Sequence, residues 1–171
     1  MDHDQLAVAI GAACRLTGEF RLRSGQTSTT YFDKYLFEAD PDLLAAIAEH
    51  AVALIPEGTE VLAGLELGGV PVATALSLRT GLPLALVRKK AKEYGTMKLA
   101  EGAQVAGRRV LVVEDVITTG GQVVLSVEEL RARSAVVGDV LCIIDRSRSH
   151  DLLDGAGIGV RSLFTSDELT V

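Results

Sequence analysis

Short apolar runs recur along the chain, and longer amphipathic segments separate them. Runs without polar alternation are typical of strands that are covered on both faces of a sheet. The segments between them have the spacing of helices that bury one side. Strands that alternate with helices predict an α/β fold with a central, mainly parallel sheet flanked by helices and right-handed crossovers. The strands predicted for this sheet are 61–64, 82–87, 110–113, 136–144 and 159–164.

The helices between these strands are predicted from capping residues and turn glycines. Asp4 precedes an amphipathic segment that ends near residue 15, and Asp40 followed by Pro41 opens a helix that ends near residue 54. Glycine-containing turns lead into helices that end near residues 80 and 133. The glycines of 64–69 bring backbone N–H groups close to a ligand, or they serve close packing of a strand–helix turn.

The first 37 residues stand apart from this alternation, and we predict that they form a small cap or hood. Strands are predicted at Glu19–Gly25, with Phe20 and Leu22 inward, and at Tyr31–Phe37, with a turn at 26–30. Four of the seven aromatic residues lie in the second strand. This pattern fits a two-stranded ribbon packed on the core, or in addition a flat hood over an aromatic base.

The strand at 110–113 leads into the chemically most informative stretch of the chain. Glu114 and Asp115 follow where the strand is expected to emerge, so their carboxylates are placed to stay hydrated or to meet a ligand. Thr118 and Thr119 offer hydroxyls, and the glycines at 120–121 let backbone N–H groups approach an anion at a helix N-terminus. Carboxylates suit sugar hydroxyls or magnesium, and the loop suits a phosphate. The stretch offers both halves of a ribose-5-phosphate site, and an ordinary strand, turn and helix is the alternative.

A second polar stretch, 88–103, begins with four cations in the five residues 88–92. It has no clear period, and a long loop in a compact domain is typical of a lid or a binding loop. We interpret it as a flexible catalytic loop whose cations hold a pyrophosphate away from water. The alternative is a solvated hairpin without a ligand.

Length and composition limit the possible classes of protein. The chain has 171 residues, 48% of them hydrophobic and 23% charged, which fits one globular domain over 1–171. No apolar run reaches the length of about 18 residues that a membrane span needs. The N-terminus lacks the pattern of a secretory signal, so we expect a cytoplasmic protein without a membrane partner. The net charge of −6 argues against a nucleic-acid surface spread over the molecule.

The cysteines and histidines do not indicate a metal or disulfide framework. Cys14 and Cys142 lie in apolar contexts and are expected to be buried thiols. His3, His50 and His150 show no metal-ligand spacing among themselves or with the cysteines.

Several segments carry a resemblance to a known family. Val112–Gln122 resembles the phosphoribosyl-diphosphate (PRPP) signature of the type I phosphoribosyltransferases, in which two acids precede a Thr/Gly phosphate loop. Segments 16–25, 31–33, 88–95 and 145–146 resemble orotate phosphoribosyltransferases, in that family's order along nearly the whole chain. The resemblance implies a type I phosphoribosyltransferase fold. It also implies transfer of phosphoribosyl from PRPP to orotate, giving orotidine 5′-phosphate and pyrophosphate in pyrimidine biosynthesis.

The resemblance further implies the residues and partners of the site. It assigns Lys92, Tyr94, Glu114 and Asp115 to catalysis. It assigns PRPP binding to Arg88, Lys89, Lys92, Glu114, Asp115, Val116, Ile117, Thr118, Thr119, Gly120, Gly121 and Gln122, and orotate binding to Arg23, Tyr31, Phe32, Thr118 and Arg146. Mg²⁺ is implied as a cofactor carried mainly by PRPP, without a direct protein ligand. A homodimer is implied in which the lid reaches the neighbouring subunit's site.

The chain departs from the family pattern at a few positions. Tyr94 replaces the histidine of the catalytic loop, and a tyrosine with a reference pKa near 10 carries no positive charge at pH 7. Gly68 stands where many members have a lysine, Arg23 where many have a lysine, and Gln122 where many have a small residue. Three alternatives therefore stay open: transfer to another base, a non-catalytic PRPP-binding regulator, and a plain α/β binding module.

Overall fold

A six-stranded sheet with the order β5-β4-β3-β6-β7-β8 forms the centre of the molecule in the computed structural model, which describes residues 1–21, 25–90 and 99–169. All neighbouring strands are parallel except β5, which pairs antiparallel with β4. The strands are β3 (Val61–Leu65), β4 (Leu84–Val87), β5 (Ala100–Gly102), β6 (Val110–Ile117), β7 (Asp139–Asp145) and β8 (Gly159–Thr165). The predicted fold class, a mainly parallel sheet between helices, is confirmed.

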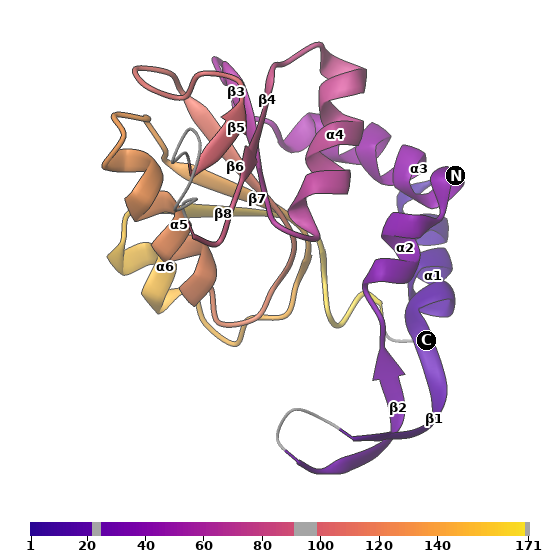
Figure 1. Ribbon diagram of the computed structural model, residues 1–171. Helices are drawn as coiled ribbons and strands as arrows, with labels where there is room; N and C mark the ends of the chain where they lie inside the picture. Colours follow the sequence, from indigo (N-terminus) through magenta and orange to yellow (C-terminus); the bar gives the residue numbers. More distant parts are fainter. Residues whose placement is uncertain (22–24, 91–98, 170–171) are drawn as a thin grey trace.

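Helices cover both faces of this sheet, as Figure 1 shows. One face packs against α1 (His3–Cys14), α2 (Tyr35–Ala39), α3 (Pro41–Ala51) with the short η1 (Val52–Leu54), and α4 (Gly69–Thr80). The other face packs against α5 (Gly121–Arg131) and α6 (Asp151–Gly155). Every residue of β3 is buried, because a strand between two helical layers has no solvent face. Cys14 and Cys142 are free thiols in this core, as expected.

Capping residues explain where several helices begin and end. The side chain of Asp40 accepts hydrogen bonds from the backbone N–H groups of Asp42 and Leu43, and Pro41 occupies the first turn, as predicted. Asp2, and not Asp4, caps α1, because its carboxylate accepts from the Gln5 backbone N–H in a capping box. None of the helices in the described part of the chain is long and apolar enough to cross a membrane.

The N-terminal segment differs from its prediction in detail. The antiparallel hairpin of β1 (Arg15–Arg21) and β2 (Thr27–Phe32) begins earlier than expected, and it projects away from the helical layer in Figure 1. The predicted strand Tyr31–Phe37 is wrong, because its second half forms α2. The Asp33 carboxylate accepts a hydrogen bond from the Tyr35 backbone N–H and starts this helix, which buries Phe37 completely.

Three further elements were not predicted at their observed places. β6 runs four residues beyond the predicted end at Val113, so Glu114 and Asp115 lie within the strand and not after it. The segment predicted as a loop over 88–103 contains β5 near its end. The short helix α6 follows β7 and has no counterpart among the predicted helices. The division into a single domain with an N-terminal hood stays a prediction.

Candidate functional site

The predicted site residues that the structure describes lie around the carboxyl ends of β3, β4, β6 and β7. The chain order reverses between β3 and β6, and ligands of open α/β sheets bind at such a switch point. Three turns line this edge: 66–68 before α4, 118–120 before α5, and 146–150 before α6. The turn between β2 and α2 adds residues 33–34 from the N-terminal segment.

The turn before α5 has the features of a phosphate loop. Gly120 has φ +77°, and a Cβ atom there would lie 2.8 Å from Leu153 Cγ, so the position requires glycine in both conformation and space. The N-cap residue Gly120 has no side chain to cap α5, and the Gly121 N–H has only a long 3.5 Å contact with the Thr119 hydroxyl, which leaves backbone N–H groups there for an anion. Thr118 and Thr119 are exposed beside it.

Three of the residues assigned to PRPP binding differ in whether their side chains are available to a ligand. Ile117 is 1% exposed and packs in the core on the α5 side, so only its backbone can serve the site. Val116 is half-buried and lines a cleft with Thr118. Gln122 donates a hydrogen bond from Nε2 to Ser126 Oγ at 3.3 Å, so its side chain runs along α5.

The two acids of β6 occupy different environments. Asp115 is 0% exposed and faces α2 and the start of α4, whereas Glu114 is half-buried. Of the two possibilities considered for these carboxylates, hydration does not hold for Asp115, and contact with a ligand stays a prediction. Lys34 Nζ lies 2.5 Å from Asp115 Oδ2, and Asp115 Oδ1 accepts a hydrogen bond from the Val116 backbone N–H at 2.6 Å.

A third carboxyl group, that of Glu38 on α2, joins this pair. Burial raises the pKa of Glu38 to about 9, with the neighbouring Asp115 as a further cause. Burial and Asp115 likewise raise the pKa of Glu114 to about 8. Burial alone would also raise the pKa of Asp115, but contacts from Glu114, Glu38 and Lys34 outweigh it and hold that pKa below its ordinary value. At neutral pH Asp115 is thus the ionised member of the cluster.

The glycines of the turn before α4 serve close packing against β6. A Cβ atom on Gly69 would lie 2.2 Å from the Val113 backbone oxygen. One on Gly68 would lie 1.9 Å from Asp115 Oδ2 and 2.8 Å from Glu38 Oε1. Of the two roles considered for these glycines, close packing is the one that the geometry supports.

The basic segment after β4 is anchored where the structure describes it. Arg88 Nε lies 3.8 Å from Glu101 Oε1 on β5, and the Lys89 backbone N–H donates to Glu66 Oε1 at 2.5 Å. These contacts place the start of the segment beside the turn before α4. Lys92 and Tyr94 lie outside the described residues, as does Arg23 of the hairpin turn.

A cleft of about 300 Å³ lies between the N-terminal segment and the carboxyl ends of β6 and β7. The Arg146 guanidinium carbon is 5.7 Å from the centre of the Phe32 ring, which is within cation–π range. The structure thereby brings together four residues predicted to bind a base. The lining residues are Tyr31, Phe32, Asp33, Lys34, Tyr35, Val116, Thr118 and Arg146.

Two hydrogen-bonded groups fix the position of Arg146. Its backbone N–H donates to the Ile117 carbonyl at 2.8 Å. The preceding Asp145 accepts from the Ser147 backbone N–H at 2.9 Å and from its hydroxyl at 2.6 Å, and it contacts His150 Nε2 at 2.7 Å. Burial alone would raise the pKa of Asp145, but the contacts with Ser147 and His150 have the larger effect and hold that pKa below its ordinary value.

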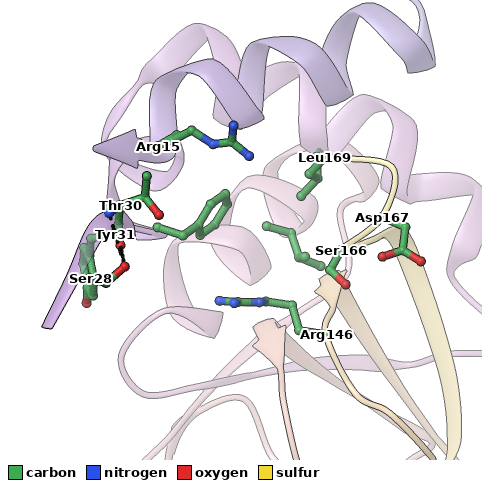
Figure 2. A pocket seen from close by; sticks show the side chains of 10 residues that line it. Arg15, Ser28, Thr30, Tyr31, Arg146, Ser166, Asp167 and Leu169 are labelled. Atoms are coloured by element: carbon green, nitrogen blue, oxygen red, sulfur yellow. Dashed lines mark hydrogen bonds between the residues drawn. The ribbon is translucent and has the colours of Figure 1, made fainter. Parts of the chain in front are cut away.

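A larger cavity of about 460 Å³ lies on the other side of the Arg146–Phe32 pair. Figure 2 shows Arg15 and Arg146 on opposite walls, with Ser166 and Leu169 from the segment after β8 beside them. The cavity shares Tyr31, Phe32 and Arg146 with the base cleft, so it continues that cleft under the hairpin.

Lys34 and Glu38 were not among the residues predicted for the site. Both reach Asp115 from a segment far away in the sequence, so no local spacing connects them to it. The available signal was local: Asp33 followed by the helix-forming Leu36, Glu38 and Ala39 indicates a helix start, and a helix places Lys34 and Glu38 on one side.

Comparisons with known proteins identify the family to which the chain belongs. A family model described as a phosphoribosyl transferase domain matches residues 37–156. An orotate phosphoribosyltransferase of Nocardioides sp. is 60% identical over 96% of this chain and 92% of its own length. The crystal structure of Mycobacterium tuberculosis orotate phosphoribosyltransferase with Fe(III) dicitrate has a TM-score of 0.90 at 30% identity, covering 100% of both chains. Its complex with PRPP has a TM-score of 0.84 at 27% identity, again over 100% of both chains. The chain therefore belongs to the phosphoribosyltransferase family and, within it, to the orotate phosphoribosyltransferases.

Proposed function

We propose that the chain transfers the phosphoribosyl group of PRPP to orotate, giving orotidine 5′-phosphate and pyrophosphate in pyrimidine biosynthesis. One observation carries this proposal: an anion loop, two ribose-type acids and an arginine-lined base cleft meet at one edge of the sheet. The 60% identity to an orotate phosphoribosyltransferase supports orotate over a purine.

In the proposed complex the donor lies across the carboxyl ends of the strands. The 5′-phosphate accepts hydrogen bonds from the loop of 118–121 and the first turn of α5. Glu114 and Asp115 accept hydrogen bonds from the ribose hydroxyls. The diphosphate faces Arg88 and Lys89, with Lys92 and Tyr94 assigned to the same task by the family resemblance.

The reaction breaks the bond between C1′ and the diphosphate oxygen and forms a bond between C1′ and N1 of orotate, and the N1 proton leaves with the released pyrophosphate. Positive charge develops on the ribose and negative charge on the diphosphate. The cations of 88–92 stabilise the developing anion, and the fixed site removes much of the entropic cost of bringing donor and base together.

The base cleft suits a planar ring that carries a carboxylate. The Phe32 ring and Tyr31 offer apolar surface, and the Arg146 guanidinium beside Phe32 offers a bidentate partner for the orotate carboxylate. Thr118 adds a hydroxyl at the same wall. Arg23 is included among the proposed orotate contacts on the family resemblance.

The proposal includes Mg²⁺ carried by PRPP. The Asp115 carboxylate contacts the Lys34 ammonium, and the Glu66 carboxylate accepts a hydrogen bond from the Lys89 backbone N–H, so both already have partners. A metal ion held mainly by the oxygens of PRPP fits these residues. Bound in that way, Mg²⁺ would neutralise part of the diphosphate charge. A homodimer with the loop of 88–103 shared between subunits, and a cytoplasmic location, are proposed on the resemblance.

Steady-state assays with Mg²⁺ and PRPP test the base assignment. We expect orotidine 5′-phosphate from orotate and no product from uracil or adenine. Arg146→Ala should raise the orotate KM about 30-fold or more, because it removes a charged partner of the carboxylate, while the PRPP KM changes little. Arg161→Ala, which removes an exposed pair with Asp139 near the amino ends of β7 and β8, is the control and should leave the orotate KM unchanged. Preferred use of adenine, or loss of PRPP binding in Arg146→Ala, would contradict the proposal.

A further inference from the structure

Lys34 forms an ion pair with a carboxylate that is completely buried. Its Nζ atom lies 2.5 Å from Asp115 Oδ2, and Asp115 is 0% exposed whereas the Lys34 side chain is 35% exposed. The ammonium therefore approaches Asp115 from the solvent side of the site. Lys34 also lines the base cleft with Thr118 and Arg146, so it stands between the base and the ribose acids.

The protein leaves room for this contact by omitting a side chain at Gly68. The direction in which a Cβ atom would point from Gly68 is filled by Asp115 Oδ2 and Glu38 Oε1. Both oxygens are buried, and Asp115 Oδ2 has the Lys34 ammonium as its ion-pair partner. The Lys34 ammonium thus lies beside three carboxyl groups, of which Asp115 is its ion-pair partner and Glu38 and Glu114 are neighbours.

The charge of this cluster decides what Asp115 can do for a sugar hydroxyl. A carboxylate accepts hydrogen bonds at both oxygens, and a charge-assisted bond to a hydroxyl is stronger than a neutral one. A buried carboxylate that loses its partner cation carries an uncompensated charge and takes up a proton or moves. The exposed ion pair of Arg79 and Glu49, 3.1 Å apart on the surface, has no such consequence because water solvates both groups.

We propose that Lys34 is a positioning residue of the transfer reaction, which keeps Asp115 ionised and aimed at the ribose and ties the base-cleft segment to the strand that carries the ribose acids. This inference rests on the proposed function, since it gives Asp115 the ribose hydroxyls as ligands. Lys34 acts through Asp115, and the reacting atoms lie beyond it.

The pH dependence of kcat/KM for PRPP separates this role from a purely structural one. Among the described residues, the groups that face Asp115 are Lys34 and Glu38 from the N-terminal side and Glu114 from its own strand. The Cys142 thiol on β7 also senses the charge of Asp115, while the start of α4 contributes Gly68 without a titratable group. In Lys34→Met, Asp115 must lose a proton without help from an ammonium. The ratio of variant to wild-type kcat/KM should therefore be about 0.1 or lower at pH 7 and rise toward 1 by about pH 9. Taking the ratio at each pH cancels ionisations that both proteins share.

Conservative and distant variants serve as controls. Lys34→Arg keeps the charge and should keep at least about half of the wild-type kcat/KM at every pH. Arg79→Met removes an ion pair elsewhere and should match the wild type. Circular dichroism compares the folding of all variants, and Lys34→Gln replaces Lys34→Met if the latter does not fold.

Calorimetric titration of Mg²⁺–PRPP adds a readout that does not need turnover. A pH-independent ratio in Lys34→Met, whether near 1 or lowered to the same extent at every pH, overturns the role of Lys34 while the proposed function stands. Wild-type protein that binds PRPP but does not convert orotate overturns the proposed function, and a pH-dependent loss of PRPP affinity in Lys34→Met then still supports the role of Lys34. Wild-type protein that neither binds PRPP nor converts orotate overturns both.

Discussion

Gly68 has ordinary right-handed helical backbone angles, with φ −68° and ψ −30°, so its backbone alone does not demand a glycine. What demands one is space, because a Cβ atom would lie 1.9 Å from Asp115 Oδ2. Many relatives were expected to carry a lysine at this position, and in this chain the ammonium that contacts Asp115 comes from Lys34 of another segment. The absence of a Cβ atom at Gly68 thus leaves the space in which the Asp115 carboxylate lies.

Gly68→Ala should consequently impair the site more than the fold. Alanine fits the helical backbone, but its methyl group displaces the Asp115 carboxylate, and a shift of about 1 Å in such a group can cost about 100-fold in kcat/KM. The measurement is steady-state kinetics with PRPP varied, alongside thermal melting. Gly138→Ala is the control, because nothing lies within 4 Å of its Cβ position and its φ is not positive. Equal kinetics for both variants would refute the packing argument.

Among the elements, the parallel strands were the easiest to predict, because burial on both faces leaves a run of apolar residues without alternation. The helix α2 was missed because Tyr31, Tyr35 and Phe37 follow a two-residue spacing that is typical of a strand. The competing signal was the Asp33 side chain, whose hydrogen bond to the Tyr35 N–H starts the helix. Local hydrogen bonding outweighed aromatic alternation.

The residues of the candidate site also divide into those that a local sequence pattern predicts and those that it does not. Glu114, Asp115, Thr118 and Gly120 follow from one contiguous pattern, and the structure places them at one edge of the sheet. Lys34, in contrast, meets Asp115 only after the N-terminal segment packs on the sheet, and a sequence pattern carries no record of that packing. The burial of Asp115 escaped prediction because the length of β6 depends on pairing with β7, whose register continues to Ile117 and Asp145.

Arg131 connects elements on the α5 side of the sheet, at the end of β7 that lies away from the site. Its guanidinium donates to the carbonyl of Val137 at 2.7 and 3.1 Å, to that of Ala156 at 2.6 Å and to that of Gly157 at 3.0 Å. One side chain thus joins the end of α5, the segment before β7 and the end of α6.

Arg131→Met should therefore lower the free energy of unfolding by about 2 kcal/mol, since it leaves three carbonyls without a charged donor. Urea denaturation measures this change, and kcat of the folded protein should stay at the wild-type value. Arg133→Met, two residues along, removes exposed contacts with Glu129, an ion pair at 2.6 Å and a hydrogen bond to its carbonyl at 2.8 Å, and should cost less than about 0.5 kcal/mol. Comparable losses for the two variants would show that Arg131 is not a connecting residue.

At the scale of the whole molecule, the acid cluster links stability to pH. Burial beside Asp115 raises the pKa of Glu38 to about 9 and that of Glu114 to about 8. In the unfolded chain both groups have ordinary values near 4.3 and are ionised at neutral pH. Between these values the folded protein holds protons that the unfolded chain releases, so raising the pH favours unfolding. Asp115 and Asp145, whose folded pKa values are lowered, act in the opposite sense, and their contribution is lost only as the pH falls through those values.

The melting temperature of the ligand-free protein should accordingly fall as the pH rises from 6 to 9. Glu38→Gln cannot ionise, so its melting temperature should fall less over the same range, and at pH 9 it should exceed that of the wild type. Glu49→Gln, which alters an exposed acid paired with Arg79, should keep the wild-type slope. If the melting temperatures of Glu38→Gln and the wild type fall in parallel as the pH rises, Glu38 is ionised in the folded protein. A cluster with a single ionised carboxylate is then the wrong description of this site.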